Sequence, residues 1–175
     1  KDVSYLNVNP AIQKVIELRS KYPWVLKTDI SKFFDTINRD ILKTVLKKKL
    51  GSSSLIPLLE KVIDCEVRAE RPSQKQDLMD AGIITGKGLR QGMPLSPALS
   101  NLILNKFDRR LYKMGLNIIR YVDDIVVLCE SFEECKRIDD TIKAELEKIK
   151  LITSPSKTEI LNPKKEVIFL GVEIF

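Results

Sequence analysis

Four consecutive residues, Tyr121-Val122-Asp123-Asp124, combine residue types that could do chemistry, because they place two adjacent carboxylates between two apolar runs. The flanking runs, 116–120 and 125–129, are rich in Ile and Val, which favour β-strands, and Asp is a common turn residue. The sequence therefore predicts a β-hairpin with acidic residues at its tip. Two neighbouring carboxylates repel each other, and a divalent metal ion with oxygen ligands would neutralise that repulsion.

Asp29 supplies a third carboxylate. The segment 24–30 is typical of a short buried strand that ends on this acid, and a helix is expected to open near Asn38. An acid at the carboxyl end of its strand could face the hairpin tip. Three carboxylates from two strands could hold two Mg²⁺ ions about 3.5–4 Å apart, the arrangement used in phosphoryl transfer. This pattern predicts polymerase or nuclease chemistry.

A third segment, 88–95, is a loop punctuated by glycine that runs into a helix. Ser96 is the predicted N-cap of that helix and Pro97 its first residue. Glycine at such a loop lets the backbone approach a flat or charged ligand closely.

With these segments in this order, the chain resembles the reverse transcriptases of the bacterial retroelement type, which include group II intron, retron-like and phage-defence enzymes. Five ordered segments are far more specific than one tetrapeptide. The resemblance covers the chain from about Trp24 to its end. The segments similar to the family's motifs A, B, C, D and E are, in order, 29–34, 91–97, 121–124, 156–158 and 169–172.

The resemblance implies a metal site that comprises Asp29, Asp123 and Asp124, with Ile30 beside the first acid. It would hold two Mg²⁺ ions, for which Mn²⁺ can substitute. Lys157 would lie near the triphosphate, where an ammonium group can stabilise charge or protonate the departing pyrophosphate. The implied catalytic residues are the three aspartates and this lysine.

The resemblance also implies the contacts with nucleotide, primer and template. Phe34, five positions after Asp29, would stack under the sugar and exclude a 2′-hydroxyl group. Gln91 would contact the incoming nucleotide, and Gly92 would let the loop pass close to it. Many relatives carry proline where this chain has arginine, which we expect to lie against the template or a phosphate backbone. The residues expected at primer and template are Tyr121, Arg90, Leu170 and Gly171.

Each of these residues also has a purely structural interpretation. Taken alone, 121–124 could be an ordinary turn, and Asp29 an acid at a strand end. Alternation makes Phe33 rather than Phe34 the expected core residue. Lys157 lies in a polar loop, where a lysine is usually just solvated.

Composition narrows the classes of function. The 175 residues, 43% of them hydrophobic, suit one soluble domain, and no apolar stretch or signal-peptide pattern indicates a membrane partner, so we expect a cytoplasmic protein. The absence of histidine and of paired cysteines argues against a zinc site and against histidine-dependent nucleophilic catalysis.

A net charge of +6 suits a protein that binds a polyanion. Part of this charge lies in 43–49, whose lysines alternate with apolar residues. The same lysines could therefore be only the solvated face of an amphipathic helix.

The hydrophobic pattern predicts an α+β fold: a ferredoxin-like polymerase palm, an antiparallel sheet with helices on one face. We expect a single domain over 1–175, a palm with part of the fingers, in a fragment that lacks the remaining fingers and the thumb and polymerises poorly alone. The expected elements are a strand at Val25–Ile30, helices at Arg39–Leu50, Leu55–Val67, Pro97–Met114 and Phe132–Lys150, loops at Arg71–Asp80 and Gly86–Pro94, and a β segment at Glu166–Phe175.

The leading hypothesis is an RNA-directed DNA polymerase that uses an RNA template, a DNA or RNA primer and deoxynucleotide triphosphates, with a cognate structured RNA as a further partner. One alternative is template-independent or protein-primed DNA synthesis in a phage-defence relative. Others are a non-catalytic nucleic-acid-binding palm, which would not need all three acids, and a palm-fold nucleotide cyclase, which the Gln91-Gly92 loop does not support. The sequence leaves the retroelement subclass, the priming mode and the oligomeric state open.

Overall fold

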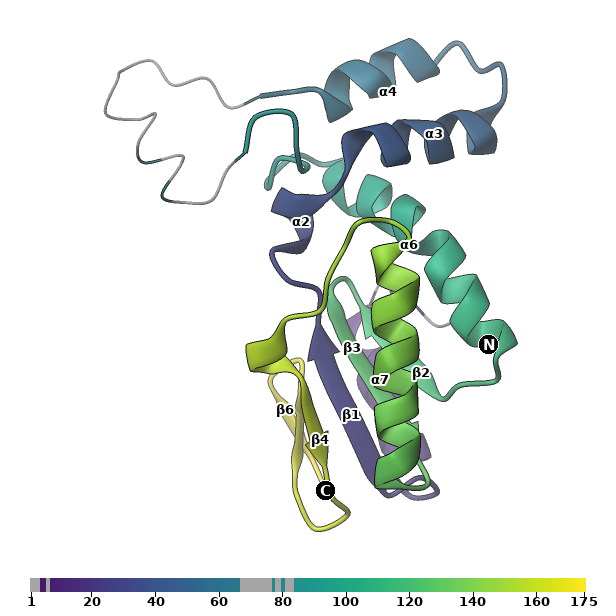
Figure 1. Cartoon of the computed structure of the whole chain (residues 1–175), viewed down its shortest axis with the longest axis vertical. Coiled ribbons are helices and arrows are strands. Elements are labelled where there is room, and N and C mark those ends of the chain that lie inside the picture. Colours follow the sequence, from purple (N-terminus) through teal and green to yellow (C-terminus); the bar gives the residue numbers. More distant parts are fainter. Residues whose placement is uncertain (1–3, 6, 67–76, 78–79, 81–83) are drawn as a thin grey trace. The chain divides into compact units, whose positions relative to one another are not determined.

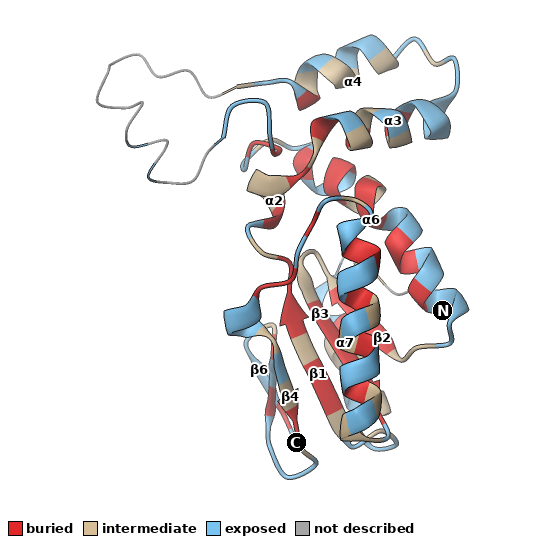
Figure 2. Ribbon diagram, viewed as in Figure 1, coloured by how far each residue is buried: buried red, intermediate tan, exposed pale blue. Residues whose placement is uncertain are grey.

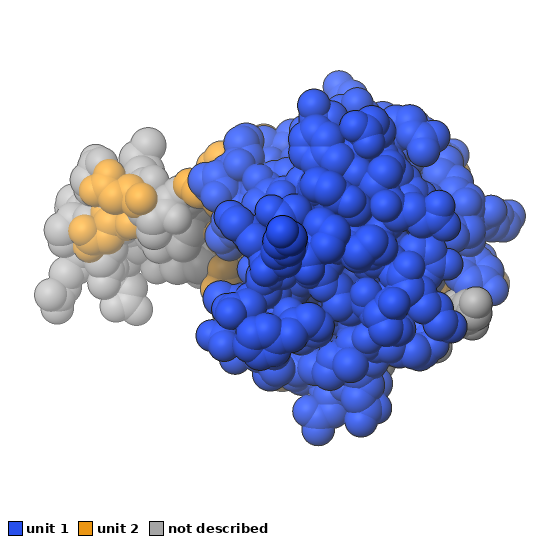
Figure 3. Space-filling view, turned by 90° about the horizontal axis from the view of Figure 1, so that it is seen from below, with its two compact units in different colours: residues 1–31, 105–175 blue, residues 32–104 orange. Residues whose placement is uncertain are grey.

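The computed structural model describes residues 4–5, 7–66, 77, 80 and 84–175. The chain divides into two compact units (Figure 3), which are described separately. Unit 1 comprises 1–31 and 105–175, and unit 2 comprises 32–104. The acidic segments 24–30 and 121–124 both belong to unit 1.

Unit 1 contains a four-stranded antiparallel sheet (Figure 1) in the order β2-β3-β1-β4. This order, with a hairpin between β2 and β3 and a helix between β3 and β4, is that of a ferredoxin-like fold and confirms the predicted fold class. The strands are β1 (Trp24–Asp29), β2 (Ile118–Tyr121), β3 (Asp124–Cys129) and β4 (Glu159–Leu161).

Helix α7 (Phe132–Glu147) packs against β1 and β3 on one face of this sheet (Figure 1). Ser131 caps it, because the Ser131 side chain accepts a hydrogen bond from the backbone N–H of Glu134. Its buried residues are Cys135, Ile138, Ile142, Glu145 and Leu146, and Figure 2 shows buried and exposed stretches alternating along the helix. Helix α6 (Ser96–Lys113) belongs to unit 1 from residue 105 onward and buries Leu111 there.

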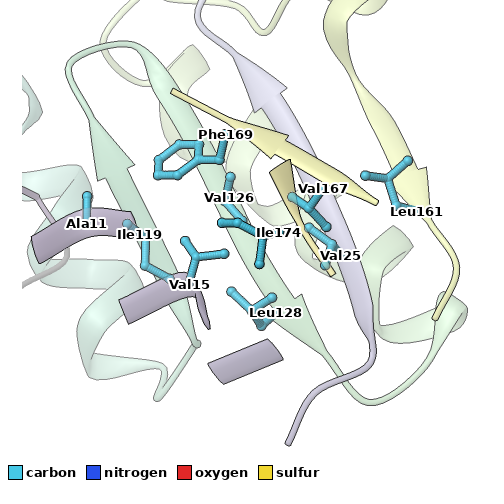
Figure 4. Close-up of a cluster of buried hydrophobic side chains, with 10 residues drawn as sticks. All are labelled: Ala11, Val15, Val25, Ile119, Val126, Leu128, Leu161, Val167, Phe169 and Ile174. Carbon is cyan, nitrogen blue, oxygen red and sulfur yellow. The ribbon is translucent and has the colours of Figure 1, made fainter. Parts of the chain in front are cut away.

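The opposite face of the sheet is covered by α1 (Val8–Arg19) and by a second sheet made of β5 (Val167–Phe169) and β6 (Val172–Ile174). The sequence pattern did not single out α1, so the expectation that helices lie on one face only does not hold, although the fold class does. Side chains of both sheets and of α1 form one buried cluster (Figure 4), and each fully buried Val or Leu adds about 1.5–3 kcal/mol relative to an exposed one. The cluster comprises Ala11, Val15, Val25, Ile119, Val126, Leu128, Leu161, Val167, Phe169 and Ile174.

Unit 2 contains α2 (Phe33–Thr36), α3 (Arg39–Leu50), α4 (Ile56–Ile63) and the first part of α6. Helix α3 has the predicted bounds, because Asn38 caps it by accepting a hydrogen bond from the Ile41 N–H.

The lysines of α3 support the interpretation of a solvated helix face. Lys43 pairs with Asp64 at 2.7 Å and Lys47 with Glu60 at 2.9 Å, while Leu42 and Leu46 are buried. Two of the basic side chains that could attract a polyanion are thus neutralised by acids of α4 and of the residue that follows it.

Three predicted boundaries are wrong. Helix α7 ends at Glu147 rather than at Lys150. Helix α4 ends at Ile63 rather than near residue 67, because Glu66 is drawn into hydrogen bonds with two arginines. Ser96 is the first residue of α6 and not its N-cap, since its hydroxyl donates to the Arg90 carbonyl at 2.7 Å. The predicted loop 71–80 lies outside the described residues, except for Asp77 and Asp80, which are helical. Among the helices that the structure describes, none is both long enough and apolar enough to cross a membrane.

Candidate active site

Asp29 and Asp124 face each other across the sheet at the end of β1. They are direct register partners in the antiparallel pairing of β1 with β3, so their side chains lie on the same face of the sheet. Tyr121 pairs with Asp124, which leaves Val122 and Asp123 as a two-residue turn. The Ile30 N–H donates to the Asp123 carbonyl at 3.1 Å and ties this turn to β1. Three aspartates therefore gather at one end of the unit 1 sheet.

The electrostatics of this cluster favour a cation. Burial raises the pKa of Asp123, and the nearby charges of Asp29 and Asp124 raise it further. Burial and the charge of Asp29 likewise raise the pKa of Asp124. Like charges placed directly opposite in a sheet repel, and a bound cation relieves that repulsion.

Lys157 supplies one cation to the cluster. Its Nζ lies 3.0 Å from Asp29 Oδ2, and this hydrogen bond, together with the aspartate charges, raises the pKa of the lysine. The loop that carries it is fixed to β1, because the Ser154 N–H donates to the Asp29 carbonyl at 2.7 Å and the hydroxyls of Thr28 and Thr158 are 2.7 Å apart. The sequence alone gave no reason to single out these supporting contacts.

Asp29, Asp124 and Lys157 border a cavity of about 400 Å³, which lies within unit 1. Polar and charged side chains line it. They belong to Lys27, Thr28, Asp29, Asp124, Ser156, Lys157 and Glu159.

The donor set fits an oxygen-liganded divalent ion, because carboxylates are the ligands that Mg²⁺ prefers. In the conformation described, no three side chains of His, Cys, Asp or Glu lie close enough together to hold one ion jointly, as far as the described residues extend. The ammonium group of Lys157 instead occupies one oxygen of Asp29. Ile30 is buried and apolar, so only its backbone carbonyl could act as a ligand.

The residues expected to contact the nucleotide lie in unit 2. Phe33 is buried, as predicted, and Phe34 is half-buried, with the two ring centroids 5.3 Å apart. Gln91 and Gly92 form an exposed turn, in which the glycine has φ +85°. A side chain is disfavoured in that conformation, which explains the need for glycine here.

Within unit 2 the loop of Gln91 is joined to α2. The Leu89 N–H donates to the Phe34 carbonyl at 2.7 Å, and the Gly88 N–H donates to the Ile37 carbonyl at 2.9 Å. A Cβ atom at Gly88 would lie only 2.6 Å from the Phe34 carbonyl oxygen. The close approach of these two segments therefore requires glycine.

A network of charged side chains, in which the two arginines are buried, holds the same loop. The Glu66 carboxylate accepts hydrogen bonds from Arg39, from Arg90 and from the Gly86 N–H, and Arg39 also donates to the Gly88 carbonyl at 2.8 Å. Although burial opposes ionisation, the hydrogen bonds from Arg39, Gly86 and Arg90 lower the pKa of Glu66 to about 2. The guanidinium of Arg90 is thus mostly buried and paired, and its expected contact with a template stays a prediction.

The remaining residues expected near a primer lie in unit 1. Leu170 and Gly171 form the turn between β5 and β6, with φ values of 51° and 79°. Tyr121 and Leu170 are both partly buried against the cluster of Figure 4. Their expected contacts with a primer stay predictions.

The sheet order and the acidic hairpin together define a polymerase palm. A sequence profile of the reverse transcriptase (RNA-dependent DNA polymerase) family matches residues 3–174, and the chain therefore belongs to that family. Members of this family generally use divalent metal ions.

Individual relatives agree with this assignment. Protein YkfC of Escherichia coli is 25% identical over 185 aligned positions, which cover 85% of this chain and 46% of that protein. The retron Mx162 reverse transcriptase of Myxococcus xanthus is 30% identical over 111 positions, covering 58% of this chain and 21% of the relative. The chain spans less than half the length of these curated relatives.

Solved telomerase structures share the fold. Telomerase from Candida tropicalis in complex with a fragment of telomeric RNA superposes with a TM-score of 0.73 at 16% identity, covering 98% of this chain and 32% of that one. The apo telomerase from the same organism gives a TM-score of 0.67. At this level of identity the likeness concerns the fold alone.

Proposed function

We propose that the protein is an RNA-directed DNA polymerase that extends a primer by nucleotidyl transfer. The observation that carries the proposal is the direct pairing of Asp29 with Asp124 beside the turn of Asp123. Family membership over residues 3–174 supports this interpretation of the acidic cluster.

In the proposed reaction, the 3′-hydroxyl oxygen of the primer attacks the α-phosphate of a deoxynucleotide triphosphate and pyrophosphate leaves. Asp29, Asp123 and Asp124 would hold two Mg²⁺ ions, or Mn²⁺ in their place, which neutralise the developing charge when bound. Lys157 would place its ammonium group beside the triphosphate and supply a proton to the departing pyrophosphate. Its contact with Asp29 shows that the side chain reaches the acids.

We assign the choice of nucleotide to unit 2. The exposed edge of Phe34 would pack under the sugar and exclude a 2′-hydroxyl group, while Gln91 and Gly92 would contact the incoming nucleotide. The buried pairing of the loop with α2 supports this assignment, because it keeps the exposed Gln91 turn on a fixed base.

The proposed partners are an RNA template and a DNA or RNA primer, with a structured RNA as a further candidate. The net charge of +6 favours binding of a polyanion. The relatives include a retron reverse transcriptase, and one of the telomerase structures contains RNA.

The test is deoxynucleotide incorporation by the full-length protein with Mg²⁺, on a primed RNA template and without any template. Asp123→Asn should abolish synthesis, whereas Asp140→Asn, at an exposed position of α7, should leave it unchanged. If the protein makes as much DNA without a template as with one, its function is template-independent DNA synthesis. RNA binding without synthesis would contradict the proposal and indicate a binding module.

A further inference from the structure

Arg120 is a fully buried arginine next to the acidic turn. Its relative exposure is 0%, and it lies on β2 immediately before Tyr121. The guanidinium forms two parallel hydrogen bonds with Asp108 of α6, Nε to Oδ1 at 2.8 Å and Nη2 to Oδ2 at 2.6 Å. A bidentate pair of this kind fixes the orientation of both groups. All of these residues belong to unit 1.

The remaining nitrogen of the same guanidinium reaches the turn itself. Arg120 Nη1 donates to the carbonyl of Val122 at 2.5 Å. Val122 has φ +56°, whereas a positive φ at the first position of a two-residue hairpin turn normally requires glycine. A β-branched residue is a genuine outlier in this region. The turn that carries Asp123 is therefore strained and is held by Arg120.

We propose that Arg120 and Asp108 are positioning residues for the acidic cluster. By holding the Val122 carbonyl, they fix the turn and so set where the carboxylates of Asp123 and Asp124 point. The inference rests on the proposed function, because it assigns the pair a role toward the groups that would bind metal and substrate.

Stability alone gives a weak reason for this pair. Replacing a buried ion pair by apolar side chains of similar volume is often neutral or stabilising, whereas removing one partner leaves a costly unpaired charge. The bond to Val122 is the part that apolar residues cannot reproduce. Removing the pair should therefore affect the turn more than the fold.

The experiment compares the wild-type full-length protein with a double variant, Asp108→Leu with Arg120→Met, which leaves no unpaired buried charge. The matched control is Arg110→Met, because Arg110 also lies on α6 but pairs with Glu145 of α7 instead of with a residue of the turn. Three readouts are taken: thermal unfolding, Mn²⁺ binding by electron paramagnetic resonance, and steady-state kinetics of deoxynucleotide incorporation.

We expect the double variant to unfold near the wild-type temperature, to bind Mn²⁺ at least about tenfold more weakly, and to lose about 10²-fold in kcat. The KM for the deoxynucleotide should stay within about twofold, because its proposed contacts lie in unit 2. The control should match the wild type in all three readouts. A second change, Val122→Gly, should restore part of the lost kcat and Mn²⁺ affinity, because glycine adopts the turn conformation without strain.

Wild-type Mn²⁺ affinity and kcat in a folded double variant would overturn the positioning role. Failure of Val122→Gly to recover either quantity would also overturn it, since the pair would then not act through the turn. If the double variant does not fold, Arg120→Lys takes its place, because it keeps the positive charge but cannot form the two parallel hydrogen bonds with Asp108. This variant must then show the same losses of kcat and of Mn²⁺ affinity. A wild-type protein without polymerase activity would contradict the proposed function, while the Mn²⁺ readout would still test the pair.

Discussion

The side chain of Lys157 is largely exposed but forms an ion pair with Asp29. Its side chain is 64% exposed, yet its Nζ lies 3.0 Å from the carboxylate of Asp29, which is 91% buried. An ion pair with one exposed member contributes little to stability, at most about 1 kcal/mol. Stability therefore gives little reason for this contact, which supports the proposed role of Lys157 at the acids.

Lys157→Met should leave the free energy of unfolding within about 1 kcal/mol of the wild type. It should lower kcat by about 10²-fold, because the proposed proton donor for pyrophosphate is lost. Lys164→Met, at another exposed lysine of the same unit, serves as the control and should change neither quantity. Primer-extension kinetics and urea unfolding measure the two effects, and equal kinetics for both variants would contradict the proton-donor role.

The adjacent rings of Phe33 and Phe34 should have separable roles. Phe34→Ala should raise ribonucleotide incorporation relative to deoxynucleotide incorporation, because the half-buried ring is the proposed barrier to a 2′-hydroxyl group. Phe33→Ala removes a ring that is only 2% exposed and should cost about 3–5 kcal/mol of stability. Competition between the two nucleotide types measures the first effect, and a Phe34→Ala ratio equal to that of the wild type would refute it.

At the scale of elements, the loop before Gln91 depends on glycine at one position. Gly88→Ala should destabilise unit 2 by more than the roughly 1–2 kcal/mol that a positive φ costs an L-residue, because its Cβ would also meet the Phe34 carbonyl. Gly86→Ala is the matched control, since Gly86 has φ +79° and no atom within 4 Å of a Cβ. Urea unfolding compares them, and equal losses would mean that the close approach to α2 is unimportant.

The Glu66 network predicts a pH-dependent stability. The pKa of Glu66 is lowered in the folded state to about 2, so its contribution is complete above its unfolded value of about 4.5 and is lost as the pH falls toward 2. Glu66→Gln should therefore destabilise the protein by roughly 2 kcal/mol near neutral pH, and by less at about pH 3.

Unfolding by urea at both pH values measures this difference. Glu60→Gln is the control, because it removes a surface pair with Lys47 and should cost less than about 1 kcal/mol. A cost for Glu66→Gln that is the same at both pH values would show that its carboxylate charge does not hold the arginines.

Elements with strong local signals could be predicted from the sequence. Helix α3 follows its cap at Asn38, α7 follows its apolar periodicity, and the acidic hairpin follows its turn. Helix α1 and strand β4 (Glu159–Leu161) were not singled out. Both depend on long-range contacts, which a local pattern does not contain: α1 packs on the far face of the sheet, and the β4 strand pairs with β1.

Some residues of the candidate site could be predicted from the sequence, and others could not. Asp29, Asp123 and Asp124 could be proposed as one cluster from motif order, and the structure brings them to one sheet end. Arg120 and Glu66 could not be recognised, because Arg120 matters through its burial and both residues matter through partners elsewhere in the chain. Charged residues that are buried and paired leave no local sequence pattern.

At the scale of the whole molecule, the connectivity explains how distant residues meet. The ferredoxin-like order makes β1 the neighbour of β3, so Asp29 faces Asp124 although the whole of unit 2 lies between them in the chain. The connectivity of the sheet, and not proximity in the sequence, thus forms the acidic cluster.

The most direct test is extension of a primer by a single deoxynucleotide on four RNA templates that differ in one base, using the full-length protein with Mg²⁺. We predict that the nucleotide added follows the template base in each case, and that Asp123→Asn and Asp124→Asn each abolish the addition. Addition of the same nucleotide on all four templates, or extension by either variant at the wild-type rate, would contradict RNA-directed synthesis at these aspartates.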